Sequence, residues 1–77
     1  MIPEDAIELI FHELRKAEKK FPGFPADPIH GIAIMIEEAG EATKAALDMH
    51  YRNGLVADLR TELAQTAAMC IRCMIVN

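Results

Sequence analysis

The C-terminal part of the chain, residues 55–76, reads LVADLRTELAQTAAMCIRCMIV. Plotted as a helix, this stretch carries apolar side chains on nearly every side, at Leu55, Val56, Leu59, Leu63, Ala67, Met69, Cys70, Ile71, Met74, Ile75 and Val76. A helix that is apolar all round is buried on most sides by its neighbours. The sequence therefore predicts a central helix from about Leu55 to the C-terminus.

Residues 4–20 are expected to form a second, amphipathic helix. Their apolar side chains recur every three or four positions, at Ile7, Ile10, Phe11, Leu14 and Ala17. Residues 21–26 contain two prolines and a glycine, which remove helical hydrogen bonds and favour turns. The first helix therefore ends in a loop.

A further helix is predicted from Pro28 to about Met49. Asp27 offers a side-chain acceptor at the N-cap, and Pro28 suits the first helical position because its missing N–H is not needed there. Asn53 and Gly54 tolerate a left-handed backbone and mark the turn that follows. No segment alternates with period two for long enough to form a strand, so the predicted fold class is all-α.

The chain is short for its apolar content. Its 77 residues, 52% of them apolar, make a single domain, residues 1–77, and a domain of this size buries only about 60% of its surface on folding. Two neighbouring helices cannot cover the third completely. We therefore expect the second and third helices to pack against their copies in a homo-dimer or tetramer, which gives a four-helix-bundle-type core.

Charge and composition exclude several classes of protein. Eight basic against twelve acidic residues give a net charge of −4, which argues against a surface for DNA or RNA. No apolar run approaches the roughly 20 residues that span a bilayer, and the N-terminus lacks a basic segment followed by an apolar one. We therefore expect a cytoplasmic protein without a membrane partner.

Carboxylates cluster in the middle of the second predicted helix. Helical spacing places Glu37, Glu41, Lys44 and Asp48 on one face, with Glu38 beside them. A solvated face is one interpretation of this pattern. The alternative is a cation site, because like charges three and four residues apart repel unless something positive lies between them.

The third predicted helix adds Glu62, which projects from a mostly apolar face. A buried lone carboxylate is costly, so it should be protonated, paired or bound to a metal. Four glutamates on two adjacent helices, Glu37, Glu38, Glu41 and Glu62, make an oxygen-rich set suited to Mg²⁺ or Mn²⁺. Such ions commonly work together with a substrate phosphate.

At these residues the sequence resembles a known family. Glu37-Glu38-Ala39-Gly40-Glu41, followed after 20 residues by Glu62-Leu63-Ala64-Gln65, is similar to the EExxE…ExxD pattern of the MazG-like all-α nucleoside triphosphate pyrophosphohydrolases. The resemblance covers about residues 20–75. It implies hydrolysis of a (d)NTP to the monophosphate and pyrophosphate, with Glu37, Glu38, Glu41 and Glu62 as metal ligands and with Glu37 and Glu38 as the water-activating catalytic residues.

One position departs from the family pattern. The final Asp is Gln65 here, and an amide offers a metal only a weaker carbonyl oxygen. Gln65 and Asp58, which lies on the same side of the helix, are therefore candidates for a metal or substrate contact. Lys44 and Arg72 are the candidates for phosphate contacts, and the alternative for both is an ordinary surface charge.

Three functions follow from these patterns. The leading one is a metal-dependent nucleotide pyrophosphohydrolase for house-cleaning or nucleotide-pool control. The competing class is a catalytically weakened helical dimer that acts as a partner-binding or regulatory module. The third is a redox module built on Cys70 and Cys73, although a core role is favoured for thiols in the middle of a helix. Phe21, Phe24 and Tyr51 lie in or beside loops, where they either stack on a nucleobase or close the ends of the core.

Overall fold

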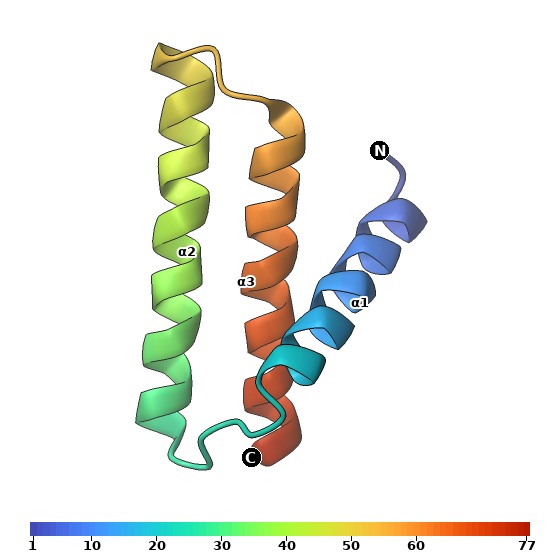
Figure 1. The fold of residues 1–77 in the computed structure, drawn as a ribbon, viewed down its shortest axis with the longest axis vertical. Helices are drawn as coiled ribbons and strands as arrows, with labels where there is room; N and C mark the ends of the chain where they lie inside the picture. The colour runs from blue at the N-terminus through green and yellow to red at the C-terminus, as the bar shows by residue number, and fades with distance from the viewer.

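The computed structural model describes all 77 residues and contains three helices and no strand. They are α1 (Pro3–Lys20), α2 (Pro28–Tyr51) and α3 (Val56–Val76), with bounds close to those predicted. Helices α2 and α3 run antiparallel side by side, and α1 crosses α3 obliquely (Figure 1). Helix α3 packs against both others, whereas α1 and α2 have no Cα atoms within 8 Å of each other. The all-α prediction is confirmed, with α3 as the central helix.

The start of α2 and the turn after it follow the local chemistry of the sequence. The Asp27 side chain accepts a hydrogen bond from the Ile29 amide at 3.0 Å and so caps the helix. In the turn, Asn53 takes the left-handed conformation with a φ of 59°. Gly54 is needed for a different reason, because a Cβ there would lie 2.9 Å from the carbonyl carbon of Asp48.

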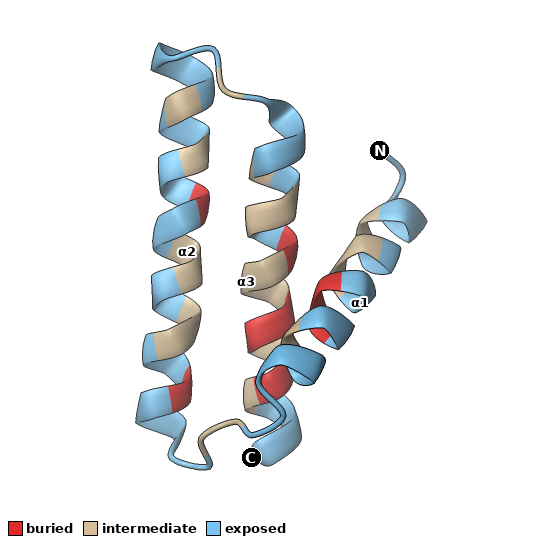
Figure 2. Ribbon diagram, in the orientation of Figure 1, coloured by how far each residue is buried: buried red, intermediate tan, exposed pale blue.

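The core of one chain is small. Only eight of the 77 residues are buried, and the central cluster consists of Leu14 from α1 with Ala68 and Met69 from α3. Figure 2 shows buried positions on the sides of the helices that face one another, with exposed surface elsewhere. Buried alanines such as Ala42, Ala64 and Ala68 let the helices approach closely. Helix α3 is therefore not covered on all sides within one chain, and the four-helix core remains a prediction.

Large apolar side chains stay exposed along α2. Ile29, Ile36 and Leu47 are all more than half exposed, and with Gly40 they follow one another at spacings of seven, four and seven residues. These spacings place the four residues on one side of the helix, which we call the α2 stripe. None of the three helices meets the length and hydropathy needed to cross a membrane.

Candidate functional site

The structure brings the four predicted glutamates into one region between α2 and α3. The pKa of Glu38 is raised above its usual 4.5, first by burial and then by the charges of Glu62, Glu41 and Glu37. Each of the other three carboxylates is thus close enough to Glu38 to disfavour its ionised form. We call Glu37, Glu38, Glu41 and Glu62 the acidic cluster.

The acidic cluster is not assembled into a finished metal site. Glu37 and Glu41 are exposed, while Glu38 and Glu62 are half-buried. No group of three or more His, Cys, Asp or Glu side chains is arranged so that it could hold a metal ion. The donor chemistry nevertheless fits Mg²⁺ or Mn²⁺, because every member is a carboxylate and their mutual repulsion favours a cation between them. Binding would require these side chains to turn toward one another.

A small cavity of about 230 Å³ lies on one side of the acidic cluster. Glu41 and Glu62 line it together with Asp58, Lys44 and Asp48. The Lys44 ammonium is 3.6 Å from one carboxylate oxygen of Asp48, and Arg52 is 3.7 Å from the other. Asp58 is thus placed beside two members of the acidic cluster, and Lys44 faces the same space while paired with Asp48.

Gln65 points toward α1 and meets a residue that sequence reasoning missed. Its side-chain amide donates a hydrogen bond to the Glu13 carboxylate, with Nε2 and Oε1 3.0 Å apart. Glu13 is only 5% exposed, and its one other partner is the Lys16 ammonium at 3.5 Å. Gln65 therefore ties α3 to α1 and satisfies a buried carboxylate.

The signal for Glu13 was present in the sequence. Glu13 follows Ile10 by three residues and precedes Ala17 by four, so it belongs to the apolar face of α1. A carboxylate on such a face needs a partner from the neighbouring helix. The identity of that partner depends on how α1 crosses α3, which the sequence pattern does not fix.

Arg72 is buried and holds the loop after α1. It is 6% exposed, and its guanidinium donates hydrogen bonds to the carbonyl oxygens of Phe21 at 2.6 Å, Gly23 at 3.4 Å and Ala17 at 3.5 Å. The same guanidinium lies 4.9 Å from the centre of the Phe24 ring. These contacts secure residues 21–24 against α3, so a phosphate contact by Arg72 would have to compete with them.

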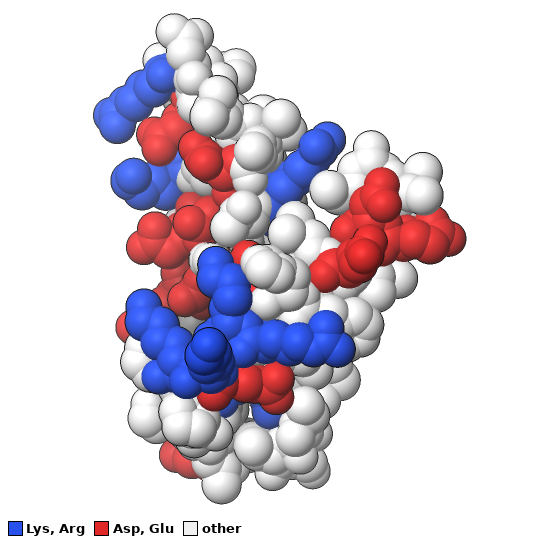
Figure 3. Space-filling view, turned by 45° about the vertical axis from the view of Figure 1, so that its right-hand side comes forward, with Lys and Arg blue, Asp and Glu red and all other residues white.

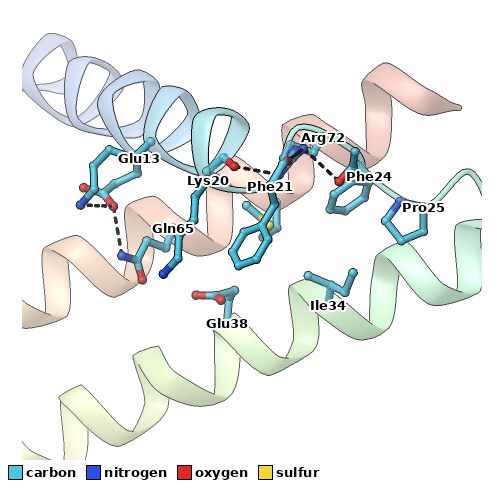
Figure 4. A pocket seen from close by; sticks show the side chains of 13 residues that line it. Glu13, Lys20, Phe21, Phe24, Pro25, Ile34, Glu38, Gln65 and Arg72 are labelled. Carbon is cyan, nitrogen blue, oxygen red and sulfur yellow. Dashed lines mark hydrogen bonds and ion pairs between the residues drawn. The ribbon is translucent and has the colours of Figure 1, made fainter.

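A larger cavity of about 550 Å³ lies on the other side of the acidic cluster, between α1, the loop, α2 and α3. We call it the loop pocket. Gln65 and Glu38 line it toward one end and Phe24 toward the other, while the Phe21 ring stands between them and Lys20 reaches in from α1 (Figure 4). Glu38 therefore belongs both to the acidic cluster and to the wall of the loop pocket.

The two cysteines lie in the C-terminal third of α3 as free, half-buried thiols. The Cys73 sulfur packs where α2 passes closely, since a Cβ on Gly31 would lie 3.2 Å from it.

Comparison of the sequence with protein-family models and curated proteins, and of the structure with solved structures, finds no match.

Proposed function

We propose that this chain is a metal-dependent nucleotide pyrophosphohydrolase that converts a (d)NTP to the (d)NMP and pyrophosphate. The observation that carries the proposal is the gathering of four glutamates from two helices beside the loop pocket, where burial and the three neighbouring charges raise the pKa of Glu38. Carboxylates held together at such an electrostatic cost are typical of functional sites. The adjoining loop pocket offers space for the organic part of a substrate.

Within this proposal, Glu37, Glu38, Glu41 and Glu62 would hold Mg²⁺ or Mn²⁺. The ion supplies charge neutralisation for phosphate oxygens and for the leaving pyrophosphate. Glu38 is the candidate base, because it belongs to the acidic cluster and also lines the loop pocket, where the substrate would lie. It would accept a proton from the water whose oxygen attacks the α-phosphorus, while the bond to the bridging oxygen breaks.

An assay of pyrophosphate release tests this function. Wild-type protein should release pyrophosphate from at least one of a panel of (d)NTPs with Mg²⁺ or Mn²⁺ and should not do so with a chelator. Glu62→Gln should abolish the activity, whereas Glu8→Gln, an exposed carboxylate on α1, should leave it unchanged. Equal activity of the two variants would show that the acidic cluster is a solvated face.

Self-association is part of the proposal, and the surface area supports it. A folded monomer of 8.6 kDa is expected to expose about 4700 Å², whereas this chain exposes 5536 Å². The excess, about 840 Å², is close to the roughly 800 Å² that each partner buries in a standard interface. We propose that the α2 stripe contributes to that interface, because Ile36 is 58% exposed and Gly40 beside it would let a second helix approach.

Light scattering tests the association directly. The wild-type protein should remain a dimer or tetramer at micromolar concentration, and Ile36→Lys should dissociate it. Ile2→Lys is the matched control, because Ile2 is equally exposed, at 58%, and precedes the first helix. A folded wild-type monomer at these concentrations would contradict this part of the proposal.

The second candidate function is a non-catalytic helical dimer that binds a partner or regulates one. One observation favours it: Gln65, which stands where the resembled family has an acidic residue, is engaged with Glu13 instead of facing the acidic cluster. A stable dimer that releases no pyrophosphate with any metal and nucleotide would support this function over hydrolysis.

A further inference from the structure

The loop pocket has a chemical gradient from one end to the other. Phe24 and Pro25 from the loop and Ile34 from α2 make one end apolar, and the Phe21 ring stands between this end and Gln65, close to Glu38 in Figure 4. Glu38 and Gln65 make the opposite end polar, next to the acidic cluster. Its volume of about 550 Å³ lies within the usual 300–1000 Å³ of small-molecule sites. Such a pocket suits a ligand with a flat apolar part and a charged tail.

Phe21 is the more accessible of the two phenylalanines. The Phe24 ring is half-buried, packs against the core cluster and is covered by the Arg72 guanidinium. Phe21 is 60% exposed, and the Lys20 ammonium lies over its ring, 5.5 Å from the ring centre. Figure 4 shows the Phe21 ring standing over the space between α1 and α2. The ring can therefore accept a stacked aromatic group.

Lys20 is the cation of the loop pocket that has no anionic partner. Lys16 pairs with the buried Glu13, and the Arg72 guanidinium is hydrogen-bonded to loop carbonyls. Lys20 makes no ion pair or hydrogen bond within the chain, and Figure 4 shows it directed toward Gln65 and Glu38. Figure 3 shows a band of basic side chains beside carboxylates on one face of the molecule, and such a band offsets the negative field for an incoming anion.

We infer that the loop pocket binds the nucleoside part of the nucleotide, with the base stacked on Phe21 and the first phosphate next to the Lys20 ammonium. This inference rests on the proposed function, because it takes a nucleotide as the ligand and directs its phosphates toward Glu38 and the acidic cluster. Phe21 and Lys20 are then substrate-binding residues. They hold the base in the loop pocket and direct the phosphates toward Glu38.

Equilibrium binding of nucleoside monophosphates tests the inference without any hydrolysis. Calorimetric or NMR titrations would use the full chain in buffer with a chelator, with inorganic phosphate as a second probe. Phe21→Ala should weaken monophosphate binding at least fivefold, as expected for loss of one base-stacking contact worth roughly 1–3 kcal/mol. Tyr51→Ala, which removes an exposed aromatic far from the loop pocket, should leave binding unchanged.

A substitution of Lys20 can be compared with the same substitution of its neighbour, Lys19. Lys20→Met should weaken binding of the monophosphates and of inorganic phosphate roughly two- to fivefold, with a smaller loss as salt is raised. Lys19→Met removes the neighbouring charge, which does not line the loop pocket, and should have no such effect. Phe21→Ala should not change the binding of inorganic phosphate, because phosphate has no ring to stack. Unchanged melting temperatures of all four variants would show that the fold is intact.

The outcomes separate the pocket from the proposed function. Wild-type binding that is undetectable at millimolar monophosphate, or equal in Phe21→Ala and Tyr51→Ala, overturns the inference even if pyrophosphate release is found. Selective loss in Phe21→Ala, without pyrophosphate release from any (d)NTP, supports the loop pocket as a nucleotide site and contradicts only the hydrolytic function.

Discussion

Gln65→Asp is the substitution that most sharply separates two roles for residue 65. Toward a metal, it adds a charge and a stronger oxygen ligand, so Mg²⁺ or Mn²⁺ binding should tighten if residue 65 belongs to the site. Toward α1, it shortens the side chain, removes the amide that donates to Glu13 and places a carboxylate near a carboxylate that is 5% exposed. Because the hydrogen bond to Glu13 is present in the structure, we expect the second effect to prevail.

The expected loss of stability follows from that one contact. A hydrogen bond to a charged group contributes about 1.5–3 kcal/mol, and about 2 kcal/mol shifts the melting temperature of a domain this small by about 8–16 °C. The whole chain should have a free energy of unfolding of only about 4–12 kcal/mol. The loss should therefore be plain in a thermal melt followed by circular dichroism.

Matched variants separate charge from length. Gln65→Asn shortens the side chain without adding charge, and Gln65→Glu adds charge at constant length. The exchange Glu13→Gln with Gln65→Glu restores one carboxylate and one amide, so it should recover most of the stability lost in Gln65→Glu alone. A Gln65→Asp protein that melts like wild type and binds Mg²⁺ tenfold more tightly, a gain of about 1.4 kcal/mol, would refute this reasoning and place residue 65 in the metal shell.

Three further predictions concern the acidic cluster and the α2 stripe. The folded chain holds the Glu38 proton more tightly than the unfolded chain, so this residue's contribution to stability should be lost as pH rises from about 4.5 through the raised pKa. Urea titrations between pH 4 and 8 should show this loss in the free energy of unfolding. Glu38→Gln should remove this part of the pH dependence, and Mg²⁺ should oppose the loss of stability. Glu41→Gln and Glu62→Gln should each lower the pKa of Glu38, measured by NMR, because both carboxylates raise that pKa. No change in either variant would mean that the four carboxylates lie farther apart than in the structure. A Cβ on Gly40 meets nothing within 4 Å in one chain, so Gly40→Ala should raise the stability of the dissociated chain by about 0.5–1 kcal/mol. The same substitution should weaken self-association in sedimentation experiments. Unchanged association would place the interface away from Gly40.

Features set by neighbouring residues were predictable from the sequence. The N-cap of α2 needs only Asp27 before Pro28, and both act within one helical turn. The nearness of Glu62 to the glutamates of α2 was also predictable, because a tight turn makes two long helices antiparallel neighbours.

The specific contacts of α1 with the rest of the chain could not be predicted from the sequence. The hydrogen bond between Glu13 and Gln65 and the contacts of Arg72 with the loop carbonyls join residues about 50 positions apart. They depend on the angle at which α1 crosses α3, and many angles satisfy the same apolar pattern. For Arg72 in particular, charge and helical position suggested a phosphate contact, whereas burial and three backbone acceptors are tertiary facts.

Because α1 and α2 do not contact each other, the molecule consists of an α2–α3 hairpin and a helix, α1, that packs on one side of it. Helix α1 is held along α3, where Leu14 completes the core cluster, and through the loop that Arg72 holds, so a local opening of α1 would break these contacts and leave those between α2 and α3. Such an opening would dismantle the loop pocket while the acidic cluster, carried wholly by α2 and α3, stays together. Under the proposed function, a cation held by the acidic cluster would therefore stay bound through fluctuations that release an organic ligand from the loop pocket.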